Sequence, residues 1–248
     1  MVRYATRTLL PFCLAWTLAA AQEGGDLQAQ IIYAYHAENS GRLTGLIQTL
    51  GTQVAAGAAD NALRYHLAHA DYRFGLLAGA QHARDADAAF SGCIDQLKAV
   101  LGKDPDSVES LILQSGCYAG LAQLKRLEAV LLRTRASDRL QSALKLAPRN
   151  PRAVLMGALQ ELSRAKSGAA ENAEAFAQLQ LAAQLFEQSS ATSIEAPGWG
   201  HADAYLELGR QLQVRGDVLG ARNWIEKALI ASPDFKAAQR QMADLMRR

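Results

Sequence analysis

The pair of residues best suited to chemistry in this chain is His66 and His69. They lie three residues apart on one predicted helix, with Asp71 nearby, and an i, i+3 pair of imidazoles can share a metal ion. The pair lacks the glutamate of a His-Glu-x-x-His motif, and no third ligand is evident in the sequence. His82 falls about 160° round the helix from His66. We therefore interpret His66 and His69 as partly exposed polar residues, with a metal site as the alternative.

Motifs for nucleophilic catalysis or nucleotide binding are missing from the sequence. Ser91-Gly92 and Ser115-Gly116 lack the Gly-x-Ser-x-Gly frame that exposes a catalytic serine. Neither the phosphate-binding Gly-x-x-x-x-Gly-Lys nor the dinucleotide-binding Gly-x-Gly-x-x-Gly occurs. The sequence therefore predicts a protein that is not an enzyme, without catalytic residues and without a cofactor.

Cys93 and Cys117 form the second notable pair. Each lies twelve residues from Pro105, on the two helices that the proline turn connects. An antiparallel hairpin places such residues at the same height, within the approach that a disulfide needs. An exported chain meets oxidising conditions, and two remaining cysteines fit a single bond, so we predict a disulfide between them. The absence of a Cys-x-x-Cys pair indicates a structural bond and not a redox centre. The alternative is two buried thiols.

Residues 1–21 have the layout of a secretory signal. Arg3 and Arg7 supply the positive end, residues 9–20 are apolar, and alanines at the end of this run suit cleavage before Gln22. The apolar run is shorter than the ~20 residues that cross a bilayer. We expect a periplasmic or secreted product with no membrane span after removal of the signal; the alternative is a retained anchor.

The charge of the mature chain excludes one class of partner. Loss of Arg3 and Arg7 from the 26 basic residues leaves the basic residues equal in number to the 24 acidic ones. No strong electrostatic attraction for nucleic acid remains. The mature chain is long enough for one sizeable core or one solenoid.

Long alanine- and leucine-rich stretches with widely spaced helix breakers predict an all-α fold. We expect the first helices over residues 28–37, 41–56, 60–84 and 85–101, with Asp60 capping the third. The turns around Pro105, Pro148 and Pro233 repeat along the chain. They indicate an array of similar helical units.

The clearest unit spans residues 202–235. Its small and apolar residues recur at i, i+3, i+4 and i+7 in a first helix and at matching positions in a second; they are Tyr205, Leu208, Gly209, Leu212, Ala221, Ile225 and Ala228. Gly216 between the helices suits the left-handed conformation that ends helices. Pro233 closes the unit, because proline cannot continue a helix.

With Pro233, these residues match the eight signature positions of the tetratricopeptide repeat (TPR) family, which the unit resembles. Tyr205, Leu212 and Ile225 replace the usual Trp, Tyr and Phe. The resemblance implies a TPR-like α-solenoid of antiparallel helix pairs. We expect one domain over residues 22–248, with an N-terminal helical hairpin, about three to four divergent repeats and a capping helix over 236–248.

The resemblance also implies where a partner would bind. Ligands of this family usually lie along the first helices of each pair, on the concave side. In the clearest unit, the residues expected to point into that groove are Asp203, Leu206, Arg210 and Gln213. Trp199 is a candidate aromatic anchor for a partner, although packing on the neighbouring helix is our preferred interpretation. Trp199-Gly200 also resembles a step found ahead of the last unit in some exported bacterial TPR proteins without an assigned activity.

Three functional hypotheses follow from these features. The first is an exported, non-enzymatic TPR scaffold that binds a protein or peptide partner in a concave helical groove. The second is a metal-dependent hydrolase built on His66 and His69. The third is an accessory subunit, or a small-ligand-binding subunit, of an envelope or transport complex. Self-association through the end faces of the array stays open.

Overall fold

The computed structural model describes residues 27–57, 60–164, 173–189 and 198–247. The predicted signal segment and cleavage site lie outside these residues. Within them the secondary structure is helical, with turns between the helices and no strand. No helix in this part of the chain is long and apolar enough to cross a membrane. The predicted all-α class is confirmed.

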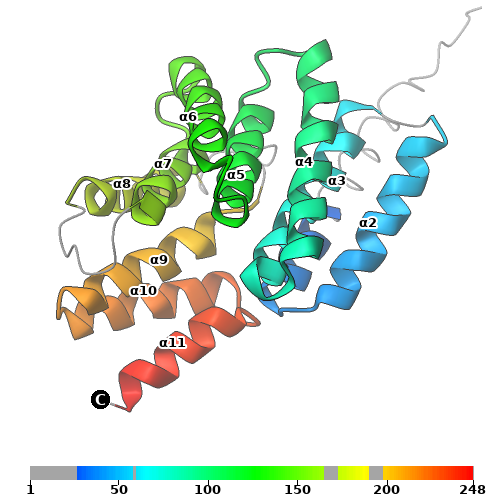
Figure 1. Cartoon of the computed structure of the whole chain (residues 1–248). Helices are drawn as coiled ribbons and strands as arrows, with labels where there is room; N and C mark the ends of the chain where they lie inside the picture. Colours follow the sequence, from blue (N-terminus) through cyan, green and yellow to red (C-terminus); the bar gives the residue numbers. More distant parts are fainter. Residues whose placement is uncertain (1–26, 58–59, 165–172, 190–197, 248) are drawn as a thin grey trace, which may run out of the picture.

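The helices follow one another as antiparallel pairs in a curved array (Figure 1). Residues 27–36 form the N-terminal hairpin with α2 (Ser40–Ala55). Four pairs then follow, and the array ends with α11 (Lys236–Met246). These pairs are α3 (Asn61–Ala78) with α4 (Ala83–Lys103), α5 (Val108–Leu124) with α6 (Ala129–Leu146), α7 (Pro151–Arg164) with α8 (Ala173–Ser189), and α9 (His201–Val214) with α10 (Val218–Ala231).

Local sequence signals explain several helix boundaries. The Asp60 carboxylate accepts a hydrogen bond from the backbone N–H of Leu63 at 2.7 Å and so caps α3, as predicted. Gly216, between α9 and α10, has φ +82°, the left-handed conformation that a glycine adopts without strain. The prediction of an unbroken helix over residues 60–84 is wrong. At Gly79 φ is +51°, and a single 3₁₀ turn over Gly79–His82 separates α3 from α4.

The clearest unit packs as its sequence predicts. Tyr205 and Leu208 on α9, and Ala221 and Ile225 on α10, are all at most 5% exposed. A Cβ atom added to Gly209 would lie 2.7 Å from Ile225 and 3.1 Å from the carbonyl oxygen of Ala221. Glycine is therefore required at this point for the two helices to approach each other.

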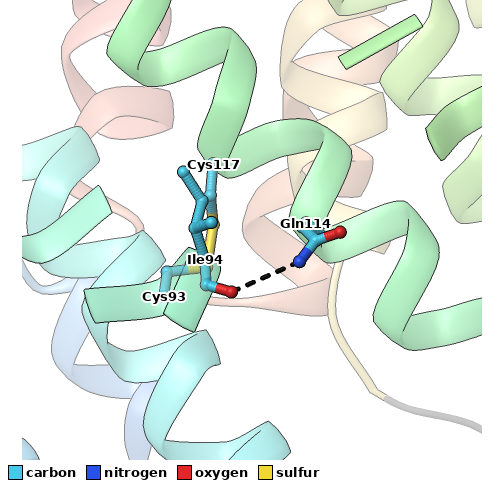
Figure 2. The surroundings of a disulfide bond; sticks show 4 residues. All are labelled: Cys93, Ile94, Gln114 and Cys117. Atoms are coloured by element: carbon cyan, nitrogen blue, oxygen red, sulfur yellow. Dashed lines mark hydrogen bonds between the residues drawn. A yellow bond between two sulfur atoms is a disulfide. The ribbon is translucent and has the colours of Figure 1, made fainter. Parts of the chain in front are cut away.

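The predicted disulfide between Cys93 and Cys117 is formed, and Figure 2 shows that it joins α4 to α5. The two Cα atoms lie 6.4 Å apart, and both cysteines are fully buried. Beside the bond, the Gln114 side chain donates a buried hydrogen bond to the carbonyl oxygen of Ile94 at 3.3 Å. The second helix of one pair is thus fixed covalently to the first helix of the next.

Candidate functional site

A buried ion pair joins two first helices that are far apart in the sequence. The Arg73 guanidinium on α3 donates two hydrogen bonds to the carboxylate of Asp203 on α9, each of 3.0 Å. Burial alone would raise the pKa of Asp203, but the charge of Arg73, aided by the His36 imidazole whose Nε2 atom lies 3.8 Å from the carboxylate, holds this pKa well below its usual range. Asp203 in turn raises the pKa of Arg73. Both groups are therefore charged, and the pair fastens α3 to α9.

The helical segment 27–36 also contacts the ion pair of Arg73 and Asp203 and the last helices of the array. The guanidinium carbon of Arg73 lies 4.4 Å from the ring centre of Tyr35. His36 stacks on Phe235 with ring centres 3.9 Å apart, and its Nδ1 atom lies 2.8 Å from the Ser232 hydroxyl. In Figure 1 the blue N-terminal helix accordingly lies beside the turn between α10 and α11. The array is therefore closed on itself, because its first helix contacts its last pair.

An ion pair on the surface also joins the N-terminal hairpin to the C-terminal end of the array. Arg240 on α11 forms two hydrogen bonds with the carboxylate of Glu38, which lies in the turn between the helical segment 27–36 and α2. This hydrogen bonding lowers the pKa of Glu38 and raises that of Arg240. It spans 202 residues of sequence.

Trp199 fills the space between α3 and α7. Its indole N–H donates a 2.9 Å hydrogen bond to the Tyr65 hydroxyl, and its ring centre lies 5.6 Å from that of His69. The guanidinium carbons of Arg73 and Arg152 approach the ring to 5.5 and 5.9 Å. The indole is only 2% exposed, so the side chain packs inside the molecule, as our preferred interpretation had it.

Several predicted groove residues are therefore not available to a partner. Leu206 was expected to point into a groove but is 3% exposed, because it belongs to the apolar cluster formed by α7 to α11. Asp203 is engaged by Arg73, and Trp199 is buried. Closure of the array buries the middle of the face that the sequence indicated as a groove.

The accessible part of that face lies at the C-terminal end of the array. Arg210 keeps a side chain that is 42% exposed and forms an ion pair with Glu207 at 3.3 Å. Gln213 is hydrogen-bonded to Gln241 on α11. Beside them is a surface hollow of about 590 Å³, lined by Gln213, Val214, Gln241, Asp244 and Arg247. Of the predicted groove residues, Arg210 and Gln213 are thus the two that a partner can reach.

The predicted histidine pair does not form a ligand set. His69 is fully buried, contrary to the expectation of partial exposure, and its Nε2 atom accepts a 3.1 Å hydrogen bond from Arg73. Burial lowers the pKa of both His66 and His69. Among residues 27–57, 60–164, 173–189 and 198–247, no three His, Cys, Asp or Glu side chains are grouped so that they could hold a metal ion. The hydrolase hypothesis gains no support from these residues.

Asp71 faces α4 instead. A Cβ atom added to Gly92 would lie 3.0 Å from its carboxylate, and the residue is 8% exposed. Burial raises the pKa of Asp71 to about 7. This carboxyl group therefore takes up a proton more readily in the folded protein than in the unfolded chain.

We expect Asp71→Asn to change how stability depends on pH. Because its pKa is higher in the folded protein than in the unfolded chain, protonation of Asp71 stabilises the fold. This contribution is fully present below the unfolded pKa of about 4 and is lost as the pH rises through the folded pKa of about 7. The variant lacks the buried charge, so at about pH 8 its free energy of unfolding should exceed the wild-type value by roughly 2 kcal/mol. Urea unfolding at about pH 4 and pH 8 measures the difference. Asp95→Asn, on an exposed carboxylate paired with Lys98, is the control; an equal effect at both pH values for Asp71→Asn would contradict the expectation.

Comparisons with known proteins bear on the fold. No protein-family model matches the sequence, and no curated protein matches it. Among solved structures, TTC0263, a thermophilic TPR protein of Thermus thermophilus, is similar with a TM-score of 0.62 and 18% identity, over 92% of this chain and 100% of that one. YrrB, described as a TPR protein with an unusual peptide-binding site, matches with a TM-score of 0.39 and 17% identity, over 82% and 91% of the two chains. The second likeness is too distant to support any conclusion about this chain.

The likeness to the Thermus protein confirms that the chain has the fold of TPR proteins. At this level of identity it shows the fold alone. Any conclusion about function must therefore rest on the surfaces that the closed array leaves accessible.

Proposed function

We propose that this protein is an exported, non-enzymatic scaffold that binds a protein or peptide partner. The observation that carries the proposal is the hollow of about 590 Å³ between α9 and α11. α9 is the first helix of its pair, and TPR proteins usually bind ligands along such helices. α11 is the unpaired helix that follows α10. In this chain, closure of the array leaves this end of the face open.

The lining of the hollow suits an extended peptide. The amide groups of Gln213 and Gln241 can donate and accept hydrogen bonds, as a peptide backbone requires. Val214 is 69% exposed and offers an apolar surface at the edge. Asp244 and Arg247 pair with each other, so the hollow presents both signs of charge and does not select a strongly charged partner.

Two features support export. Residues 1–21 have the three-part layout of a secretory signal. The disulfide between Cys93 and Cys117 is of a kind that persists in oxidising compartments and is rare in reducing ones. The periplasm, or the outside of the cell, is the proposed location.

Photo-crosslinking in the producing cells tests the proposed site. A photoreactive amino acid at Val214 should crosslink to a defined partner, whereas the same amino acid at Thr44, on the exposed face of α2, should not. Gln213→Ala with Gln241→Ala should weaken the crosslink at Val214, because the variant loses the amides offered to the peptide backbone. No crosslink at Val214, or the same products at both positions, would contradict the proposal.

A further inference from the structure

The turn between α5 and α6 and the first residues of α6 carry large aliphatic side chains that the described part of the chain leaves exposed. Leu127 is 102% exposed, Val130 is 78% exposed and Leu131 is 52% exposed. The backbone of Glu128 is already helical, and its N–H bonds to the carbonyl oxygen of Lys125 at 3.1 Å. The turn thus leads directly into α6, and the i, i+3, i+4 spacing places the three aliphatic residues together.

Arginines flank this aliphatic group. Arg126 lies in the turn directly before Leu127. Arg133 lies three residues after Val130 on α6, the spacing of neighbours on a helix surface. Both arginines are exposed, and within the described residues neither guanidinium group has an ion-pair or hydrogen-bond partner. The neighbouring Lys125, by contrast, is paired with Asp87 at 3.0 Å.

The surrounding charge is positive. Residues 125–139 contain five basic and two acidic side chains. One of the two, Glu128, immediately precedes α6, where its charge complements the positive end of the helix. The net positive charge of this segment attracts an anionic surface.

The shape of this region distinguishes between kinds of anionic partner. Burying an aliphatic side chain in a protein partner requires a matching pocket on that partner, and Leu127 here is fully exposed at the surface. A lipid headgroup region deforms around such side chains, and it accepts aliphatic groups beneath a layer that binds arginine. Each basic side chain near an anionic bilayer adds to the attraction.

We propose that the turn formed by Leu127, Val130 and Leu131, with Arg126 and Arg133, binds the surface of an anionic phospholipid bilayer. The aliphatic side chains enter the headgroup region, and the two guanidinium groups contact lipid phosphates. This surface is separate from the hollow between α9 and α11, so a scaffold that binds a partner there could at the same time be held at a membrane. The proposal does not depend on the identity of that partner.

Co-sedimentation with vesicles tests the proposal. The protein is purified from the producing cells in the form that accumulates there. We expect binding to vesicles of phosphatidylglycerol and phosphatidylcholine in equal parts, and little binding to phosphatidylcholine alone. Salt at about 1 M, where the Debye length is roughly 3 Å, should remove most of the binding. Any contribution of residues 1–21 is common to every variant.

Two variants separate the apolar from the charged contribution. Leu127→Ser with Leu131→Ser should weaken partition at least about tenfold, because two aliphatic side chains no longer leave water. Arg126→Glu with Arg133→Glu should abolish binding at low salt. Ile230→Ser removes another exposed aliphatic side chain, 81% exposed on α10, and should leave binding unchanged.

Three results would overturn the proposal. One is a failure of the protein to sediment with anionic vesicles, and another is an equal effect of Ile230→Ser and of the Leu127 and Leu131 double variant. The third is that Leu127→Ser with Leu131→Ser abolishes self-association of the protein, measured by sedimentation velocity, without changing its binding to vesicles. In that case the turn would be an interface between two copies of the chain.

Discussion

Arg73→Ala should lower the free energy of unfolding by about 3–5 kcal/mol. The variant leaves the Asp203 carboxylate, which is nearly enclosed, without the guanidinium that donates two hydrogen bonds to it. It also removes the cation that lies over the rings of Tyr35 and Trp199. Urea denaturation followed by circular dichroism measures the loss.

Two controls make this expectation specific. Arg222→Ala breaks the exposed ion pair with Glu226 on α10 and should cost less than about 1 kcal/mol, as surface pairs usually do. Adding Asp203→Ala to Arg73→Ala should recover part of the loss, because no buried charge is then left unpaired. An effect of Arg73→Ala no larger than that of Arg222→Ala would show that the closing contact contributes little to stability.

Replacing both cysteines, Cys93→Ala with Cys117→Ala, should lower the free energy of unfolding by about 3 kcal/mol. The disulfide joins residues 24 positions apart, and a loop of this length restricts the unfolded chain by roughly that amount. Because the bond also joins two successive helix pairs, its loss should destabilise both pairs. Urea denaturation of the oxidised protein and of the double variant measures the difference.

Reduction provides the matching control. The wild-type protein unfolded and refolded with dithiothreitol should approach the stability of the double variant, whereas the double variant itself should not respond to the reductant. Equal denaturation midpoints for the oxidised and reduced wild-type protein would contradict a stabilising role of the bond.

The sequence was sufficient to predict the repeating unit, because the unit depends on local rules. The periodicity of Tyr205, Leu208, Ala221 and Ile225 defines a buried stripe on each helix of a pair, and all four residues are buried. Gly216 has the left-handed backbone that its position between two helices required. The equal spacing of the two cysteines from Pro105, together with the oxidising compartment that the signal segment implies, favoured the disulfide that the structure contains.

The closure of the array could not be predicted in this way. The contact of Arg73 with Asp203 spans 130 residues, and it depends on the accumulated rotation of every pair between them. Helical periodicity identifies the face of α9 that turns away from its partner helix, but it does not show whether solvent or another unit covers that face. This is why Leu206 was wrongly expected to be exposed.

Weak signals of the closure were nevertheless present in the sequence. Arg73 stands between the aromatic residues Tyr72 and Phe74 in a stretch whose other residues pack into the core, and His36 lies close to the end of the first helix. Arginine is almost never fully buried unless it is paired. The partner, Asp203, could not be identified without the fold.

Hydrogen exchange followed by mass spectrometry tests the closed array most directly. Closure of the array predicts that backbone amides of residues 27–36 and of α9 exchange slowly in the wild-type protein, since both segments contact the buried Arg73. It also predicts that both segments lose protection together in Arg73→Ala, whereas α5 and α6 keep theirs. Rapid exchange of residues 27–36 in the wild-type protein, at the rate of an unfolded segment, while α9 stays protected would contradict the closure. The inner face would then be open along its length to a partner.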